Sequence, residues 1–188
     1  VIFGVFVIGY TISIYNGLQT LKTQIKASIQ EIGNQLKRQA SLIPNLQKTV
    51  KGYLEHEKGV FKMLTEARQA AEKAGETGRG QDVQEAIDKM QQVVPQLNVI
   101  MEDNPEMKAD KTITKFMNEL TDTADKLMYA RRSVIDLTQA YNQKLVTFPS
   151  NLVANLFGFV EEKGLATALS GSHLEVSEDE MKDVEVDF

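Results

Sequence analysis

The sequence contains no cysteine and no tryptophan, and it has only four prolines and two histidines among 188 residues. Without cysteine, the chain can form neither a disulfide nor a thiolate metal site. The scarcity of proline and the frequent Gln, Lys, Ala, Leu and Glu favour helix over sheet. With 42% hydrophobic residues, a chain of this length can bury one substantial core.

No motif for catalysis, a metal or a nucleotide is visible either. His56 stands beside Glu57, but adjacent residues on a helix point about 100° apart and make a poor metal pair. The Gly-Arg-Gly run at 78–80 follows no strand and precedes no Gly-Lys-Ser/Thr, so it is no phosphate loop. The candidate acids and bases form no recognisable catalytic set: Glu57, His56, Asp103 and Glu119. We therefore expect no enzyme activity, no cofactor and no metal site.

Charge is unevenly distributed along the chain, whose net charge is −5. Between residues 16 and 54 the cations outnumber a single acid, Glu31; they are Lys22, Lys26, Lys37, Arg38, Lys48 and Lys51. From Glu175 onward, acids dominate. The two ends therefore have opposite charge. Because the cations are sparse and no aromatic residues alternate with them, we expect no nucleic-acid binding.

The uncharged stretch 1–15 predicts a transmembrane helix in contact with the lipid bilayer. Its apolar side chains are Val1, Phe3, Val5, Phe6, Val7, Ile8, Ile12 and Ile14. As a helix it would rise about 22 Å, short of the hydrocarbon thickness of about 30 Å, so we expect the span to begin before Val1. A secretory signal is a second interpretation, although no small-x-small cleavage site precedes Tyr15. A buried core helix is a third, which the apolar character of the whole segment disfavours.

After this stretch, apolar residues recur every three or four positions and predict a long amphipathic helix. They are Leu18, Leu21, Ile25, Ile29, Ile32, Leu36, Ala40 and Ile43. Pro44 should interrupt the helix because it lacks an N–H. The periodicity nevertheless keeps its phase beyond Pro44, through Leu46 and Val50 as far as Ala71. This favours a kinked, continuous helix over a turn at 41–45.

Glu57 is the one ionised residue within that periodic pattern. In one interpretation it lies at the edge of a core formed by Leu54 and Phe61. In the other it forms a buried polar layer with an arginine of another helix, for which Arg131 is the candidate.

Three further helices are predicted at 81–102, 108–145 and 151–163, each with an apolar face. The fold class is therefore all-α, with a transmembrane helix that continues into an antiparallel, up-and-down bundle. We expect a transmembrane helix at 1–15, a helical bundle at 16–163 and an acidic, partly disordered tail at 164–188. In the tail, Val184, Val186 and Phe188 alternate with acids, either as solvated residues or as an extended segment that binds a partner.

Several short motifs occur together in this order and spacing: Tyr15-Asn16, Arg38, Leu42-Ile43-Pro44-Asn45-Leu46, Val50-Lys51-Gly52-Tyr53, His56-Glu57, Ala67-Arg68, Asn104-Pro105-Glu106-Met107-Lys108-Ala109, Ala130-Arg131-Arg132, Tyr141-Asn142, Phe148-Pro149-Ser150 and Val184-x-Val186-Asp187-Phe188. In this respect the chain resembles the LemA family over nearly its whole length. It departs from the family pattern at Asn104, Ala124-Asp125 and Val134-Ile135. The resemblance implies a single-span bacterial membrane protein with a helical-bundle body, no established enzyme activity and no known cofactor.

These patterns lead to two functional hypotheses. In the first, the chain is a structural or scaffolding protein in the bacterial cell membrane. It would form a homo-oligomer, such as a ring or a larger shell, because the long helix would leave apolar surface uncovered. The candidate assembly or lipid contacts are Leu18, Leu21, Lys22, Ile25, Lys26, Ile29 and Ile32. In the second, it is an adaptor or regulator of another membrane protein, such as a protease or sensor. The basic residues after the span favour a cytoplasmic body.

Overall fold

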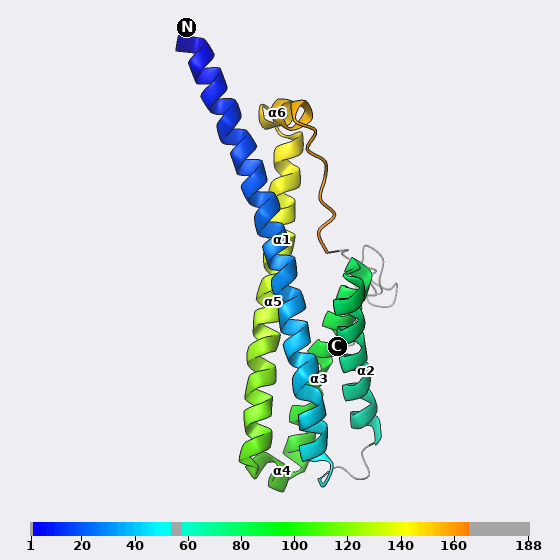
Figure 1. Cartoon of the computed structure of the whole chain (residues 1–188). Coiled ribbons are helices and arrows are strands. Elements are labelled where there is room, and N and C mark those ends of the chain that lie inside the picture. Colours follow the sequence, from blue (N-terminus) through cyan, green and yellow to red (C-terminus); the bar gives the residue numbers. More distant parts are fainter. Residues whose placement is uncertain (1, 54–57, 166–188) are drawn as a thin grey trace, which may run out of the picture.

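The computed structural model describes residues 2–53 and 58–165, which form six α-helices. These are α1 (Ile2–Val50), α2 (Lys58–Thr77), α3 (Gly80–Asp103), α4 (Pro105–Ala109), α5 (Lys111–Val146) and α6 (Ser150–Leu156). Long helices run alternately down and up, the short α4 lies at the end away from the amino terminus, and α6 lies across the other end (Figure 1). The predicted all-α, up-and-down arrangement is confirmed.

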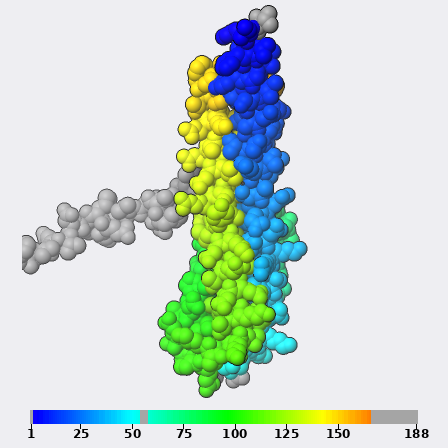
Figure 2. Space-filling view, turned by 90° about the vertical axis from the view of Figure 1, so that its left-hand side faces the viewer, coloured from blue at the N-terminus to red at the C-terminus, as the bar shows by residue number. Residues whose placement is uncertain are grey.

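The molecule is a narrow rod in which α1 and α5 lie side by side along most of its length. The α2–α3 pair covers only the half of the rod farther from the amino terminus (Figure 1). The start of α1 extends beyond the end of α5 (Figure 2). The rod is therefore two long helices thick near the amino terminus and four helices thick at the other end.

Helix α1 passes through Pro44 without a break, as predicted. It ends at Val50, however, so the prediction of one helix as far as Ala71 is wrong. The chain reverses between α1 and α2, and Val60, Leu64 and Ala71 bury their side chains from α2 instead. The uninterrupted periodicity was misleading because two antiparallel helices that share one core can have apolar faces in the same phase.

The main core follows the apolar faces that the sequence predicts. Along α1 it includes Ile32, Leu36, Ile43, Leu46 and Val50, all nearly inaccessible to solvent. Helix α2 contributes mainly small side chains, Ala67, Ala70, Ala71 and Ala74. Small residues let helix backbones approach closely, and Ala86 of α3 is also fully buried. Two glutamines of α1, Gln35 and Gln39, lie in this core as well, which the sequence analysis did not predict.

Helix α6 is shorter than predicted, because it ends at Leu156 rather than at residue 163. Gly158 follows with a φ of +69°, a left-handed conformation that stops the helix. The chain then returns along α5 to Leu165, which is buried in the main core. Gly164 lies against Thr138, and a Cβ at that position would come within 2.8 Å of the Thr138 hydroxyl oxygen. Residues 164 and 165 therefore pack on the helical body, although the sequence assigned them to the tail.

The first prediction concerns Pro44 within α1. Pro44→Ala should raise the free energy of unfolding by about 1–3 kcal/mol, because the helix regains an N–H and loses a ring that crowds the carbonyl of Ala40. Urea unfolding followed by circular dichroism in mild detergent would measure the change. Asn45→Ala, at the exposed neighbouring position, should change it by only about 0.5 kcal/mol. Destabilisation by Pro44→Ala would indicate that Pro44 defines a turn.

Candidate functional site

The first turns of α1 are apolar, and no other part of the described chain packs around them. Ile2 is 89% exposed, and the exposed positions continue along the helix: Phe3, Val5, Phe6, Val7, Ile8, Tyr10 and Ile12. Within the described residues, α1 is the one helix that is long and apolar enough to cross a membrane. Its length and composition suit a membrane span or a signal sequence. Of the predicted span residues, Val1 lies outside the described part, and Ile14 is already partly buried against the body.

A second, smaller core begins where this bare segment ends. It consists of Leu18, Ile25, Tyr141 and Ala154, with Ile14, Leu21, Leu137, Leu145 and Phe159 packed around them. The ring of Tyr15 makes edge contacts with Phe157 and Phe159, at centroid distances of 4.9 and 5.5 Å. Helix α6 and the residues after it are thus fixed beside α1, next to its exposed apolar turns.

Polar contacts hold the returning segment after α6 on α5. The Tyr141 hydroxyl donates to the carbonyl of Val160 at 3.0 Å. The Asn142 amide donates to the carbonyl of Glu162 at 2.8 Å and accepts from its N–H at 3.0 Å. The Glu162 carboxylate then pairs with Lys22 of α1 at 3.2 Å. Because both side chains of this pair are about one-third exposed, its main effect is to position the segment, and it contributes at most about 1 kcal/mol.

The structure separates the predicted assembly residues into two groups. Leu18, Ile25 and Ile32 are buried within a single chain, and Leu21 is partly buried, so none of these four offers a free apolar surface. Lys22 is engaged with Glu162. Lys26 and Ile29 remain exposed. The sequence could not separate these groups, because it did not show that α5 covers this face of α1.

One of the two residues of the predicted Glu57–Arg131 layer, Glu57, lies outside the described part of the chain, as do the tail positions Val184, Val186 and Phe188. Arg131 is half-buried in α5, and its Nε has no hydrogen-bond partner among the described residues. The side-chain oxygens of Gln35 and Gln39 likewise have none there. Buried polar groups of this kind are costly unless they find a partner or a water.

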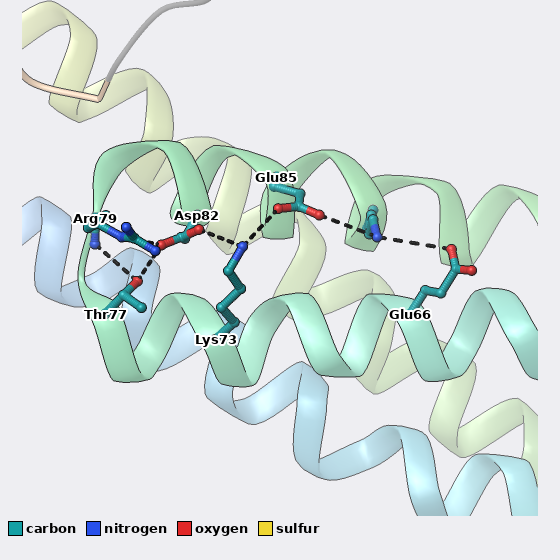
Figure 3. Close-up of polar contacts among 7 residues, drawn as sticks. Glu66, Lys73, Thr77, Arg79, Asp82 and Glu85 are labelled. Carbon is teal, nitrogen blue, oxygen red and sulfur yellow. Dashed lines mark hydrogen bonds and ion pairs between the residues drawn. The ribbon is translucent and has the colours of Figure 1, made fainter.

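A cluster of ionised side chains joins α2 to α3, and the sequence analysis did not identify it (Figure 3). Asp82 is 6% exposed and is the centre of the cluster. It accepts from the Lys73 ammonium at 2.8 Å, from the Thr77 hydroxyl at 2.6 Å and from Arg79 Nε at 2.8 Å. Lys73 also reaches Glu85 at 3.5 Å. The one local signal in the sequence is the three-residue spacing of Arg79 and Asp82.

These donors determine the ionisation of Asp82. The Lys73 ammonium, then the Thr77 hydroxyl and the Arg79 guanidinium, hold the pKa of the Asp82 carboxyl well below its usual value, against the opposing effect of burial. The contacts tie the end of α2 to the start of α3. Their arrangement is that of a structural clamp, since the oxygens of Asp82 are occupied by donors from its own chain.

A hydrogen-bonded cap closes the opposite end of the rod from α6. Asp110 accepts from the N–H groups of Thr112 and Ile113 at the start of α5, and Tyr53 donates its hydroxyl proton to Asp110 at 3.2 Å. These backbone donors lower the pKa of the Asp110 carboxyl, and its carboxylate raises the pKa of the Tyr53 hydroxyl. The contact links the segment after α1 to the first turn of α5.

A surface hollow lies between α1 and α2 in the described part of the chain. The hollow between α1 and α2 is lined mainly by amides and unlike charges, namely Gln30, Asn34, Lys37, Glu72 and Glu76. In residues 2–53 and 58–165, no three His, Cys, Asp or Glu side chains could jointly hold a metal ion. Both histidines, His56 and His173, lie outside these ranges. The described residues thus combine an exposed apolar start of α1 with a bundle in which the Asp82 contacts join α2 to α3.

A comparison with protein families gives one finding. The chain matches the model of the LemA family over residues 28–188, which agrees with the resemblance seen in its motifs. The matched region contains most of the helical body, whereas the exposed apolar turns of α1 precede it. No curated protein matches the chain.

The second prediction tests the Asp82 clamp through its pH dependence. The folded-state pKa of Asp82 lies below its unfolded value, so its stabilisation is present above about pH 4 and is lost as the pH falls further. Asp82→Asn should therefore lower the melting temperature at pH 7, and the difference from the native protein should shrink steadily from about pH 5 to pH 2.

The matched control is Asp103→Asn at the exposed end of α3. It should leave the melting temperature nearly unchanged across the same pH range. A difference between Asp82→Asn and the native protein that stays constant with pH would contradict a charge-dependent clamp.

Proposed function

The chain belongs to the LemA family, and on this premise we propose that it is a non-enzymatic scaffolding protein. The start of α1 would anchor it in the bacterial cell membrane, and its helical body would associate with further copies. The observation that carries the proposal is the form of α1. The first turns of this helix are apolar and exposed. The rest of the same helix forms the centre of the bundle.

The anchor is supported by the apolar side chains that the first turns of α1 expose on every side. Exposed apolar side chains on every side of a helix are unfavourable in water and favourable in lipid. The same helix continues without a break into the buried positions Leu18, Ile25 and Ile32. A retained span fits this continuity better than a cleaved signal, because the segment directly after the bare turns is part of the fold. The cations from Lys22 onward favour a body in the cytoplasm.

Self-association is supported by the uneven thickness of the rod. Near the membrane anchor, α1 is covered by α5 and α6 but not by the α2–α3 pair (Figure 1). Lys26 and Ile29 of α1 are exposed, as is Ile135 of α5. A neighbouring copy could cover the partly apolar surface of this thinner half. Lys26, Lys37 and Arg38 have no ion-pair partner in the described part of the chain, so the acidic tail of another copy or anionic lipid could bind them.

The alternative is an adaptor that binds a different membrane protein. One observation favours it: Tyr129, a large aromatic residue, is 77% exposed on the outer side of α5. Exposed aromatic residues are frequent anchors of protein interfaces. Crosslinking in native membranes distinguishes the two, since self-crosslinks support the scaffold and one dominant foreign partner supports the adaptor.

The third prediction tests the anchor. Val5→Asp together with Ile8→Asp should move the protein from the membrane fraction to the soluble fraction, because each buried carboxylate costs roughly 2.5–3.5 kcal/mol near a span centre. Gln19→Asp, at an exposed position nearer the body, should leave it in the membrane.

Two further readouts use the same cells. The native membrane-bound chain should retain its apolar start by mass spectrometry, and protease added outside spheroplasts should leave the body intact. A mature chain that lacks residues 2–15 would contradict the span, and digestion of the body from outside would contradict its placement in the cytoplasm.

The fourth prediction tests assembly. In mild detergent, mass photometry should find particles several times the mass of one chain. Ile29→Glu should weaken the association at least about tenfold, because it places a charge on a surface that a neighbouring copy would bury. Val99→Glu, on an exposed position of α3, is the matched control. A native protein that is entirely monomeric would contradict the scaffold.

A further inference from the structure

The two longest uncharged stretches of the sequence meet at one end of the folded molecule. The first runs from Val1 to Leu21 and the second from Leu145 to Val160. The second contains α6 and the turns on either side of it. Edge contacts between Tyr15 and both Phe157 and Phe159 place the two stretches side by side. This juxtaposition depends on the fold, because the stretches are far apart in the sequence.

The second stretch turns large apolar side chains outward. Its exposed residues, each more than half accessible to solvent, form what we call the α6 patch: Val146, Phe148, Leu152, Leu156, Phe157 and Val160. Val153 and Ala154 of the same helix face inward and are buried. Leu152 and Leu156 are four residues apart and therefore lie on one side of α6. Helix α6 thus has one apolar side on the body and another that the described residues 2–53 and 58–165 leave uncovered.

The position of the α6 patch indicates what covers it. Helix α6 lies across the end of α5, beside the point where α1 extends beyond the body (Figure 1). Since α1 rises about 1.5 Å per residue, Tyr15 lies only about 5 Å along the axis from Ile12, which is still exposed. A membrane that surrounds the bare turns of α1 would therefore have its surface at the level of α6.

Charged groups begin immediately below this level. Lys22 pairs with Glu162, and the Lys144 ammonium lies so close to α1 that a Cβ on Gly17 would be 3.4 Å from it. Glu161 and Lys163 follow directly after the α6 patch in the sequence. The change from uncharged to charged residues thus occurs at about the same height on α1, on α5 and after α6. Such a shared boundary is typical of proteins at the edge of the hydrocarbon layer.

We propose that the α6 patch is a second membrane contact, which inserts into the boundary between headgroups and acyl chains beside the α1 span. This inference rests on the proposed anchor, because the same bilayer must surround α1. A second copy of the chain is the other occupant that an apolar surface could have. Lipid is favoured because Phe157 of the patch contacts Tyr15, three residues beyond the exposed apolar turns of α1, and because the patch ends at the same charged boundary.

The experiment uses the absence of cysteine from the chain, so that each introduced cysteine is the only site for a nitroxide label. Single variants of the full chain are labelled in liposomes of mixed zwitterionic and anionic phospholipid: Leu152→Cys and Leu156→Cys in the α6 patch, Val7→Cys in the span, and Val99→Cys. Val99 is 60% exposed on α3, near the end of the rod away from α6, and is the matched apolar control. Electron paramagnetic resonance then compares relaxation by oxygen, which concentrates in lipid, with relaxation by a water-soluble nickel complex.

Labels at Leu152, Leu156 and Val7 should relax faster with oxygen than with nickel, by several-fold relative to Val99. If Val7 reports lipid while Leu152 and Leu156 report water, the second contact is wrong and the anchor stands. If Val7 also reports water, the proposed anchor itself is wrong. If the labels at 152 and 156 are shielded from both reagents and broaden each other's spectra between chains, a second copy occupies the α6 patch and the lipid contact is overturned.

Discussion

The burial of one face of α1 against α5 is the interaction on which the rest of the structure depends. That face runs from Leu18 through Ile25, Ile32 and Leu36 to Val50, and every one of these side chains is almost completely buried. Each buried Leu or Ile contributes about 1.5–3 kcal/mol relative to an exposed one. In the half of the rod near α6, α5 is the one long helix among the described residues that covers α1, and α6 and the segment that returns from it complete the packing there. The α2–α3 pair widens the core only in the other half.

The periodicity of the sequence was sufficient to predict the helices and most of the core. It identified α1, α3 and α5, and it correctly carried α1 through Pro44. It could not locate the reversal after Val50, because the apolar residues of α2 keep the phase of α1 although they belong to an antiparallel helix. Gly52 was the available local signal for a break. Gly158 was a similar signal that α6 would end before residue 163.

The sequence predicted only those features of the candidate site that depend on composition and not on how the helices pack. An uncharged run such as 1–15 is visible in the sequence, whereas the clamp around Asp82 depends on α2 lying beside α3 so that Lys73 reaches it. The assembly residues show the same limit. Leu18 and Ile32 look like free surface when α1 is considered alone, and they are core residues once α5 is in place. The sequence did not predict the α6 patch either. The uncharged run around it becomes a candidate membrane contact only because the fold puts it beside Tyr15 of α1.

The continuity of α1 connects the proposed anchor to the proposed assembly. A span joined to a body by a flexible linker leaves the body free to tilt and rotate, and ordering it against a neighbour then costs conformational entropy. Here the exposed apolar turns and the core of the bundle belong to one helix, so a span formed by those turns would also determine the direction of the body. A second contact through α6 would further restrict rotation about the axis of α1. Copies held in the same orientation would present Ile29 and Lys26 at a common distance from the membrane. Association would then lose less rotational freedom than it does in solution, and a modest interface would be enough to assemble many copies in the plane of the membrane.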